Sequence, residues 1–299
     1  MLQDLTTEQR NPNSLNLDRL SAAEIVNLMN TEDAGVAAAV ARERQPIADA
    51  IAVIADSFQA GGRLFYIGAG TSGRLGVLDA AECPPTFNTP PELVVGLIAG
   101  GPPALTKAVE GAEDSTTLGA DDLRAHNFSS ADVLVGIASS GRTPYVLGGL
   151  KYARQLGAKT VGVTCNLNSE LHQHAEIMIA PVVGPEILSG STRLKAGTAT
   201  KMVLNMLTTG AMILIGKTYG NLMVDVRASN IKLQHRSQRI VSEITGLTSD
   251  QASLLLQRCD GEVKTAIVCC LRDTPVEMAR MMLAKCRGRL SDALHESQT

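Results

Sequence analysis

The chain has 299 residues, of which 44% are hydrophobic and 19% are charged, and its formal net charge is −3. This much apolar material excludes a mostly disordered chain, and the slightly acidic balance gives no basic field to attract a nucleic acid. Aromatic residues make up 3% of the chain and tryptophan is absent, so we expect no stacking platform for single-stranded nucleic acid.

The sequence indicates neither export nor a membrane span. The N-terminus lacks the basic and apolar regions of a signal peptide, and the six cysteines form no C-x-x-C pair, so we expect them to be reduced. The most apolar run, residues 202–216, is shorter than the roughly 20 residues that span a bilayer, and we predict a buried core helix there. The histidines lack metal-ligand spacing. We therefore expect a cytoplasmic protein with no bound metal.

The first 60 residues are predicted to form a polar arm followed by two helices. Residues 1–20 are polar and irregular in pattern. Ser21 can cap the first helix, because Glu24 stands three residues later and completes a capping box. A stripe of isoleucines marks the second helix, which is predicted to end at the glycine pair 61–62.

Five short apolar runs follow, and each is typical of a strand buried on both faces. Helical patterns alternate with them, which favours an α/β fold with a parallel sheet and helices on both sides. The predicted strands are Leu64–Ile67, Leu93–Ile98, Val133–Ile137, Thr160–Val163 and Ile177–Ala180. The predicted helices are 74–82, 103–110, 144–156 and 169–174, with one long helix over Lys195–Tyr219.

Strand patterns stop at about residue 239. The remainder shows four short helical stretches, which are broken by Gly246, Gly261, Pro275 and Gly288. This bundle is similar to the ubiquitin-associated type, but a packing or dimer-contact role is the simpler expectation. We predict three parts: an N-terminal arm with helices over 1–60, an α/β domain over 61–238, and a helical bundle over 239–299.

Two loops rich in glycine and hydroxyl side chains follow predicted strands and open predicted helices. Residues 68–74 are Gly-Ala-Gly-Thr-Ser-Gly-Arg, and residues 138–144 are Ala-Ser-Ser-Gly-Arg-Thr-Pro. In a parallel α/β sheet such places form the ligand crevice, where backbone N–H groups and the helix dipole favour an anion. The side chains that we assign to ligand binding here are Thr71, Ser72, Ser139, Ser140, Arg142 and Thr143.

The first loop also matches G-x-G-x-x-G, which occurs in dinucleotide-binding units. Such a unit needs an acidic residue about 20 positions later, at the end of the second strand, and residues 97–103 contain none. Neither loop has the lysine-containing pattern of nucleotide triphosphatases. Two similar loops at equivalent places therefore favour a small phosphorylated ligand over a nucleotide, and over glycines that serve tight turns alone.

Carboxylates and a second polar segment complete the candidate site. Glu82 precedes a double proline and Glu113 lies in a polar stretch, and two carboxylates at one site can divide acid and base roles. Solvated side chains remain the alternative for both. Segment 184–198 leads into the long predicted helix, with helix capping and solvated charges as the alternative to ligand binding. In this segment we assign Glu186, Ser191, Arg193 and Lys195 to substrate binding.

These motifs resemble those of the N-acetylmuramic acid 6-phosphate etherase family, which belongs to the sugar isomerase (SIS) superfamily. The last segment is also similar to one in the glucokinase regulatory protein, and Ser189 stands where the family pattern has threonine. The resemblance implies a three-layer SIS-type fold, a homodimer with the sugar site near its interface, and no metal or organic cofactor. The motifs that carry the resemblance are 68–76, 79–86, 108–115, 139–145 and 184–198.

The resemblance implies cleavage of a D-lactyl ether, which gives N-acetylglucosamine 6-phosphate and D-lactate by elimination and water addition, in peptidoglycan recycling. It implies that Glu82 protonates the departing lactate and that Glu113 is the second carboxylate. An acid that stays protonated near neutral pH needs a raised pKa, so we expect Glu82 to be desolvated. A sugar-phosphate isomerase and a non-catalytic sugar-phosphate sensor are the alternatives on the same fold.

Overall fold

A computed structural model of the chain describes residues 5–226 and 231–295. The chain divides into two compact units, the first made of residues 1–81 and 92–208 and the second of residues 82–91 and 209–299. Within the described ranges, no helix combines the length and the apolar character that crossing a membrane requires. The three-part division with boundaries after residues 60 and 238 stays a prediction.

The N-terminal region contains three helices where the sequence predicted two. The capping box at the start of the first helix is confirmed, since Ser21 and Glu24 bond each other's backbone N–H. Gly35 stands between the first two helices, where a helical glycine is unfavourable. Among the described residues, three 3₁₀ turns precede α1, namely η2 Thr6–Glu8, η3 Pro12–Ser14 and η4 Leu17–Arg19. The helices are α1 Ala22–Asp33, α2 Val36–Arg42 and α3 Arg44–Gln59.

Five parallel strands form one sheet in the order β2-β1-β3-β4-β5, which confirms the predicted α/β class. Every residue of β1 and β3 is buried, as their unbroken apolar runs require. In β1, Phe65 and Ile67 join one hydrophobic cluster, while Tyr66 points to the opposite face. The strands are β1 Leu64–Gly68, β2 Val94–Ile98, β3 Val133–Ile137, β4 Lys159–Val163 and β5 Ile177–Ile179.

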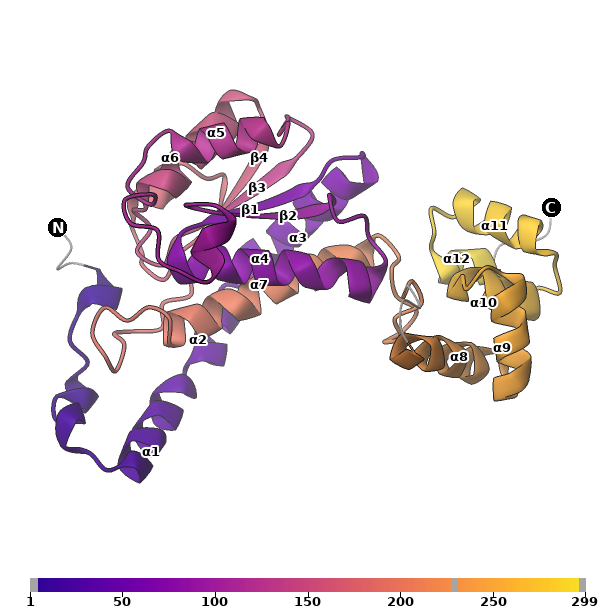
Figure 1. The fold of residues 1–299 in the computed structure, drawn as a ribbon, viewed down its shortest axis with the longest axis horizontal. Coiled ribbons are helices and arrows are strands. Elements are labelled where there is room, and N and C mark those ends of the chain that lie inside the picture. Colours follow the sequence, from indigo (N-terminus) through magenta and orange to yellow (C-terminus); the bar gives the residue numbers. More distant parts are fainter. Residues whose placement is uncertain (1–4, 227–230, 296–299) are drawn as a thin grey trace. The chain divides into compact units, whose positions relative to one another are not determined.

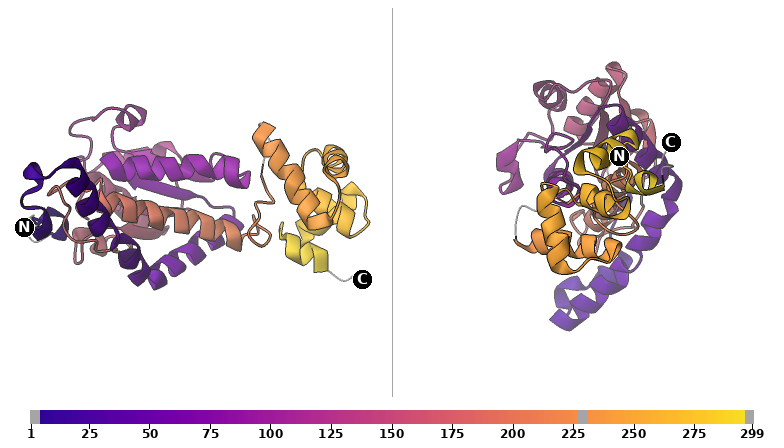
Figure 2. Two further views of the ribbon diagram at one scale, coloured as in Figure 1. Left: turned by 90° about the horizontal axis from the view of Figure 1, so that it is seen from below. Right: turned by 90° about the vertical axis from the view of Figure 1, so that its right-hand side faces the viewer.

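Helices cover both faces of the sheet (Figure 1). Helices α5 Leu118–Ala125 and α6 Pro144–Gln155 lie on one face, and α3, α4 Gly70–Phe87 and α7 Lys195–Leu214 lie on the other. Helices α4 and α7 run side by side (Figures 1 and 2), and Asn205 donates to the Asp79 carboxylate across them at 2.8 Å. The Tyr66 hydroxyl donates to the same carboxylate at 2.9 Å, and burial raises the pKa of Asp79.

In the part of the described chain that contains the sheet, two predicted helices are wrong and helix α5 was not predicted. Residues 103–110 form only the 3₁₀ turn η5 Pro102–Leu105, because the Arg74 side chain donates to the carbonyls of Ala104 and Leu105. Residues 169–174 likewise form only the 3₁₀ turn η6 Glu170–Gln173. Helix α5 was missed because its charged sequence hides a narrow buried face of Gly119, Ala120 and Leu123.

The remaining helix predictions differ from the structure only at their ends. Helix α4 begins at Gly70 and continues through the proline pair to Phe87, whereas the prediction covered 74–82. Helix α7 ends at Leu214, five residues before the predicted end. It is half-buried rather than enclosed, because Met206, Ile213 and Leu214 are exposed on it.

The C-terminal bundle is confirmed as a set of short helices with its own core, but the described residues form five helices, where the sequence predicted four, and the first of them begins at Ile231. Buried side chains from several helices, among them Val241, Ala266 and Ile267, form one hydrophobic cluster. Gly246, Gly261 and Gly288 have positive φ at the breaks, and Pro275 caps the N-terminus of α11. The helices are α8 Ile231–Thr245, α9 Ser249–Arg258, α10 Val263–Leu271, α11 Val276–Lys285 and α12 Leu290–His295.

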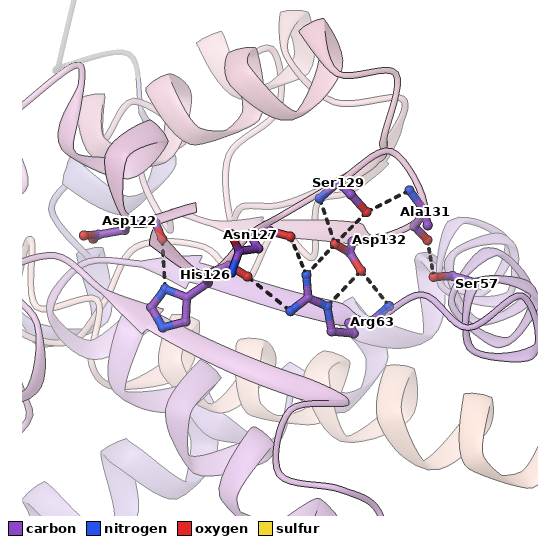
Figure 3. A network of polar contacts seen from close by, with 8 residues as sticks. All are labelled: Ser57, Arg63, Asp122, His126, Asn127, Ser129, Ala131 and Asp132. Atoms are coloured by element: carbon purple, nitrogen blue, oxygen red, sulfur yellow. Dashed lines mark hydrogen bonds and ion pairs between the residues drawn. The ribbon is translucent and has the colours of Figure 1, made fainter. Parts of the chain in front are cut away.

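A network of side chains closes the amino-terminal edge of the sheet, at the starts of β1 and β3 (Figure 3). The buried Asp132 carboxylate accepts from the backbone N–H and Nε of Arg63, at 2.9 and 3.1 Å. Its other oxygen accepts from Arg63 Nη2 at 2.9 Å and from the Ser129 N–H at 2.8 Å. Ser57 donates to the Ala131 carbonyl at 2.8 Å (Figure 3). Donors and acceptors at this edge therefore satisfy one another.

Candidate functional site

The carboxyl-terminal edge of the sheet carries the candidate site. Loop 68–74 joins β1 to α4 through close contact between two glycines. A Cβ on Gly73 would lie 2.7 Å from the Gly68 carbonyl oxygen and 2.6 Å from Ile98 Cγ1, so only glycine fits there. Thr71 is half-buried and Ser72 is buried in the first turn of α4. The first N–H groups of this helix have no acceptor within the helix, so the loop offers them to a ligand.

Loop 138–144 follows β3, the neighbour of β1 in the sheet. The Ser139 carbonyl accepts three hydrogen bonds, from Thr164 Oγ1 at 3.1 Å, Cys165 N at 3.0 Å and Asn166 Nδ2 at 2.8 Å. Because C=O and N–H point in opposite directions across a trans peptide, this fixes the Ser140 N–H away from those donors. The loop therefore presents a backbone donor in a fixed direction.

The same loop ends at the N-terminus of α6. Thr143 is the N-cap residue, but the described residues show no capping bond from its side chain, and Pro144 follows it. Gly141 has φ +70 and lies against the Ser169 side chain, which leaves no room for a Cβ. Arg142 is half-buried. The Thr143 hydroxyl and the Arg142 guanidinium are therefore available donors for an anion, whereas the N–H groups in the first turn of α6 already have acceptors.

The start of α7 lies beside both loops. A Cβ on Gly197 would lie 3.7 Å from Thr71 Cγ2 of the first loop. The Cys165 thiol, directly after β4, donates to the Ala196 carbonyl at 3.9 Å. Ser191 is half-buried and Arg193 is exposed in the segment that leads into this helix. The structure thus gathers three of the segments that the sequence singled out.

Glu186 caps helix α7, which is the role that the sequence analysis gave as the alternative to ligand binding. Its side chain is fully buried, and its two oxygens accept from the backbone N–H groups of Ala196 at 2.9 Å and Lys195 at 3.0 Å. Burial raises the pKa of Glu186, and these two N–H groups oppose that effect. Glu186 therefore caps α7, whose first N–H groups have no acceptor within the helix, and its contact with substrate stays a prediction.

Lys195 is also buried, and its ammonium lies 2.6 Å from Oε2 of Glu32 on α1. The side chains of Asn11 and Asn13 donate to the same carboxylate, each at 2.8 Å. Burial opposes ionisation of Glu32, but the hydrogen bonds from Asn13, Lys195 and Asn11 hold its pKa below the ordinary value. The charge of Lys195 is thus paired within the protein, and its predicted contact with the ligand stays a prediction.

The two predicted catalytic carboxylates belong to different compact units, Glu113 to the first and Glu82 to the second. Glu113 is exposed, and its backbone carbonyl accepts from the Tyr145 N–H at 3.0 Å, so it lies beside the first turn of α6. Glu82 lies in the second compact unit, near the C-terminal end of α4, and is not among the residues that the first unit gathers. Glu82 is exposed in the single chain, so the predicted desolvation is not found there.

Two residues of this edge were missed by the sequence analysis. Asn166 is buried after β4 and bonds the Ser139 carbonyl, and Thr7 of the N-terminal arm is buried against it. Each is an ordinary polar residue in a polar stretch, and 159 positions separate them. No local pattern reveals such a pair.

Two family descriptions match this part of the chain. The glucokinase regulatory protein N-terminal SIS domain matches residues 46–154, and the SIS domain matches residues 116–210. An N-acetylmuramic acid 6-phosphate etherase from Rhodopirellula baltica is 64% identical over 293 residues, which cover 98% of this chain and 97% of that protein. One from Clostridium beijerinckii is 54% identical over 295 residues, with 99% and 97% covered.

The chain belongs to the N-acetylmuramic acid 6-phosphate etherase family. The resemblance seen in the motifs is thereby confirmed, including its SIS character. A solved structure from Bacteroides fragilis, named as a candidate phosphosugar isomerase involved in capsule formation, aligns with a TM-score of 0.50 at 17% identity. It covers 64% of this chain and 91% of that chain, and the likeness shows the fold that this etherase-family chain shares with it.

Proposed function

We propose that this protein cleaves the D-lactyl ether of N-acetylmuramic acid 6-phosphate and releases N-acetylglucosamine 6-phosphate and D-lactate. The observation that carries the proposal is the pair of hydroxyl-rich loops at neighbouring strand ends, in a chain that belongs to this etherase family. The proposed setting is the cytoplasm, in the catabolism of amino sugars from peptidoglycan. The proposed partner is a small sugar phosphate rather than a nucleic acid or a membrane.

In this proposal the phosphate binds between the N-termini of α4 and α6. Backbone N–H groups and hydroxyls surround it there, and helix dipoles favour its negative charge. Ser191 and Arg193, at the start of α7, bind the remainder of the substrate, which carries the lactyl carboxylate. The side chains assigned to the phosphate are Thr71, Ser72, Ser139, Ser140, Arg142 and Thr143.

The reaction needs the open-chain sugar, because its C1 aldehyde makes the proton on C2 acidic. A base removes that proton, the bond between C3 and the ether oxygen breaks, and a double bond forms between C2 and C3. Lactate leaves with a proton on its oxygen. Water then adds at C3 and C2 regains a proton, so that one water is consumed for each lactate released.

Two carboxylates exchange these protons in the proposal. Glu82 protonates the departing lactate and then activates the water, and Glu113 removes the proton from C2. The place of Glu113 beside the first turn of α6 supports its role, because the proposed phosphate site lies at the same helix end. Each acid or base of this kind is typically worth 10²–10⁴-fold in rate.

We also propose that the working form is a homodimer in which a second copy covers α4. Leu78 on α4 and Met206 on the adjacent α7 are exposed apolar side chains, and Glu82 follows Leu78 by one helical turn. A second copy would exclude water from the Glu82 carboxyl, as its proposed acid role requires. Light scattering at micromolar concentration tests this, and a monomer that is fully active would contradict it.

The proposed reaction is tested by assaying D-lactate release from N-acetylmuramic acid 6-phosphate in ¹⁸O-labelled water. We expect lactate together with label on C3 of the sugar product. Label in the lactate hydroxyl would instead mean cleavage on the lactyl side, and the roles of both carboxylates would be wrong. A folded protein that binds the sugar phosphate but releases no lactate would favour the isomerase or the sensor.

A further inference from the structure

The N-terminal arm, which we define as residues 5–14, lies against the carboxyl-terminal edge of the sheet. Thr7 is 1% exposed, and its backbone N–H donates to Asn166 Oδ1 at 3.3 Å. In return, Asn166 Nδ2 donates to Thr7 Oγ1 at 3.0 Å. The arm is thus joined by two hydrogen bonds to a buried side chain of the candidate site.

This pairing fixes which way the Asn166 amide points. An asparagine side chain is nearly symmetric in shape, and only its hydrogen-bond partners distinguish the oxygen from the nitrogen. Thr7 supplies one donor for the oxygen and one acceptor for the nitrogen. The second hydrogen of the same nitrogen is thereby directed at the Ser139 carbonyl, 2.8 Å away. Thr7 consequently helps to hold the peptide that presents the Ser140 N–H.

A second contact anchors the arm four residues later. Asn11 is 3% exposed, and its side chain donates to the Pro185 carbonyl at 3.1 Å and to Glu32 at 2.8 Å. Glu32 in turn pairs with Lys195 at the start of α7. The arm therefore connects two segments of the candidate site, loop 138–144 and the segment that leads into α7.

The comparisons separate the arm from the general sugar-phosphate domain. The two SIS matches begin at residues 46 and 116, so the arm lies outside both. The match to the Clostridium beijerinckii etherase covers 99% of this chain and therefore reaches Thr7. The arm is thus a part that this chain shares with etherases and that the SIS matches lack.

We propose that the arm is a working part of the sugar-phosphate site, in which Thr7 is a positioning residue that holds loop 138–144 through Asn166. Thr7 does not touch the ligand, and it acts by keeping the Ser139 carbonyl turned inward and the Ser140 N–H turned toward the phosphate. The inference rests on the proposed function in one respect, namely that this loop binds the phosphate.

The test compares Thr7→Val, which removes the hydroxyl, with Thr7→Ser, which keeps it. Calorimetry measures the Kd of inorganic phosphate and of N-acetylglucosamine 6-phosphate, and lactate release gives kcat and KM. We expect Thr7→Val to raise both Kd values and KM about threefold to tenfold, the range of one neutral hydrogen bond. We expect kcat to change less than about twofold, and Thr7→Ser to match the wild type.

Ser57→Ala is the matched control, because it also removes a hydrogen-bonded hydroxyl, here one that donates to the Ala131 carbonyl at the opposite edge of the sheet. It should leave both Kd values unchanged. Asn166→Asp cannot donate to Ser139 or to Thr7, so it should weaken phosphate binding more than Thr7→Val does. It replaces Thr7→Val in the test if Thr7→Val does not fold.

Unchanged phosphate binding in Thr7→Val would overturn the inference, as would an equal loss in Ser57→Ala. A wild-type protein that binds no phosphate would overturn the inference together with the loop assignment. A wild-type protein that binds phosphate and releases no lactate would overturn only the proposed reaction, and the binding constants of the variants would still decide the role of Thr7.

Discussion

The two edges of the central sheet are built from the ends of the same strands, yet their polar groups are arranged in opposite ways. At the amino-terminal edge, the Asp132 carboxylate, the Arg63 guanidinium and nearby carbonyls satisfy one another (Figure 3). At the carboxyl-terminal edge, side chains such as Asn166 bond loop carbonyls and leave N–H groups directed outward. The difference teaches that one edge uses its polar groups to stabilise the fold, while the other leaves N–H groups free for the ligand that we propose.

The largest expected effect is on kcat, and it tests whether the reaction can be lost while both edges of the sheet stay intact. Glu82→Gln should lower kcat by about 10²–10⁴-fold, because glutamine neither gives nor takes the proton that the proposed reaction needs. The Kd of inorganic phosphate and the free energy of unfolding should stay unchanged, since Glu82 lies outside both edges and glutamine has the same size as glutamate. Steady-state kinetics, calorimetry and urea denaturation measure the three quantities.

The exposed Glu92→Gln on the following segment is the control for charge alone, and its kcat should equal that of the wild type. Turnover by Glu82→Gln at the wild-type rate would remove Glu82 from the mechanism. Glu113→Gln in the same assays shows whether the second carboxylate is needed for turnover.

Asp132→Ala tests the closed edge. It leaves the Arg63 guanidinium and two backbone N–H groups without their buried acceptor, so we expect a loss of about 3 kcal/mol in the free energy of unfolding. The folded variant should keep the wild-type KM. Urea denaturation measures the stability, and Asp121→Ala, which breaks an exposed ion pair with Arg124, should cost less than about 1 kcal/mol. A changed KM in Asp132→Ala would contradict the division of tasks between the edges.

Two crowded glycines test the same contrast at the level of the backbone. Gly73 lies in the first phosphate loop, and Gly62 lies at the closed edge, where a Cβ would meet the Ala131 carbonyl. Both alanine variants should lose about 1–3 kcal/mol of stability through forced backbone shifts. Only Gly73→Ala should also weaken phosphate binding, by about tenfold or more, because the shift moves the ligand-facing N–H groups. Equal phosphate affinities in the two variants would contradict the assignment of loop 68–74.

The smallest expected effect concerns pH and the Glu32–Lys195 pair. The pKa of Glu32 is held below its ordinary value of 4.5 in the folded protein, so its pairing stabilises the fold above that pH. This contribution is lost as the pH falls through the lowered pKa. Glu32→Gln should therefore be less stable than the wild type at pH 7, and the difference should shrink below pH 4.5. A difference that grows on acidification, in denaturation curves between pH 3 and 7, would contradict this assignment.

The sequence predicted the features that depend on local pattern. All five strands were found, because strands such as β1 and β3 are buried on both faces and leave unbroken apolar runs. The two glycine-rich loops were found because close backbone contact, as between Gly68 and Gly73, restricts the residue type. Local pattern failed for helix α5, because a short helix with a narrow buried face gives little periodicity. It also missed the break at Gly35 between α1 and α2.

The roles of single polar residues were harder to predict, because they depend on distant parts of the chain. Lys195 was assigned to the ligand, but it pairs with Glu32, which stands 163 positions earlier. Glu186 was assigned there too, although the N–H groups of α7 occupy both its oxygens. A charged residue in a candidate binding segment has the same local sequence in either role, and only the fold distinguishes them.

The docking of the arm also has a consequence for the order in which the molecule can form. The contacts of Thr7 with Asn166 and of Asn11 with Pro185 span 159 and 174 positions. During synthesis the arm is made long before these partners. Contacts of such long separation form late in folding, because the loop that they close is long. Asn166, which bonds the Ser139 carbonyl of loop 138–144, therefore forms its two hydrogen bonds with Thr7 late in folding, although Thr7 was made long before it.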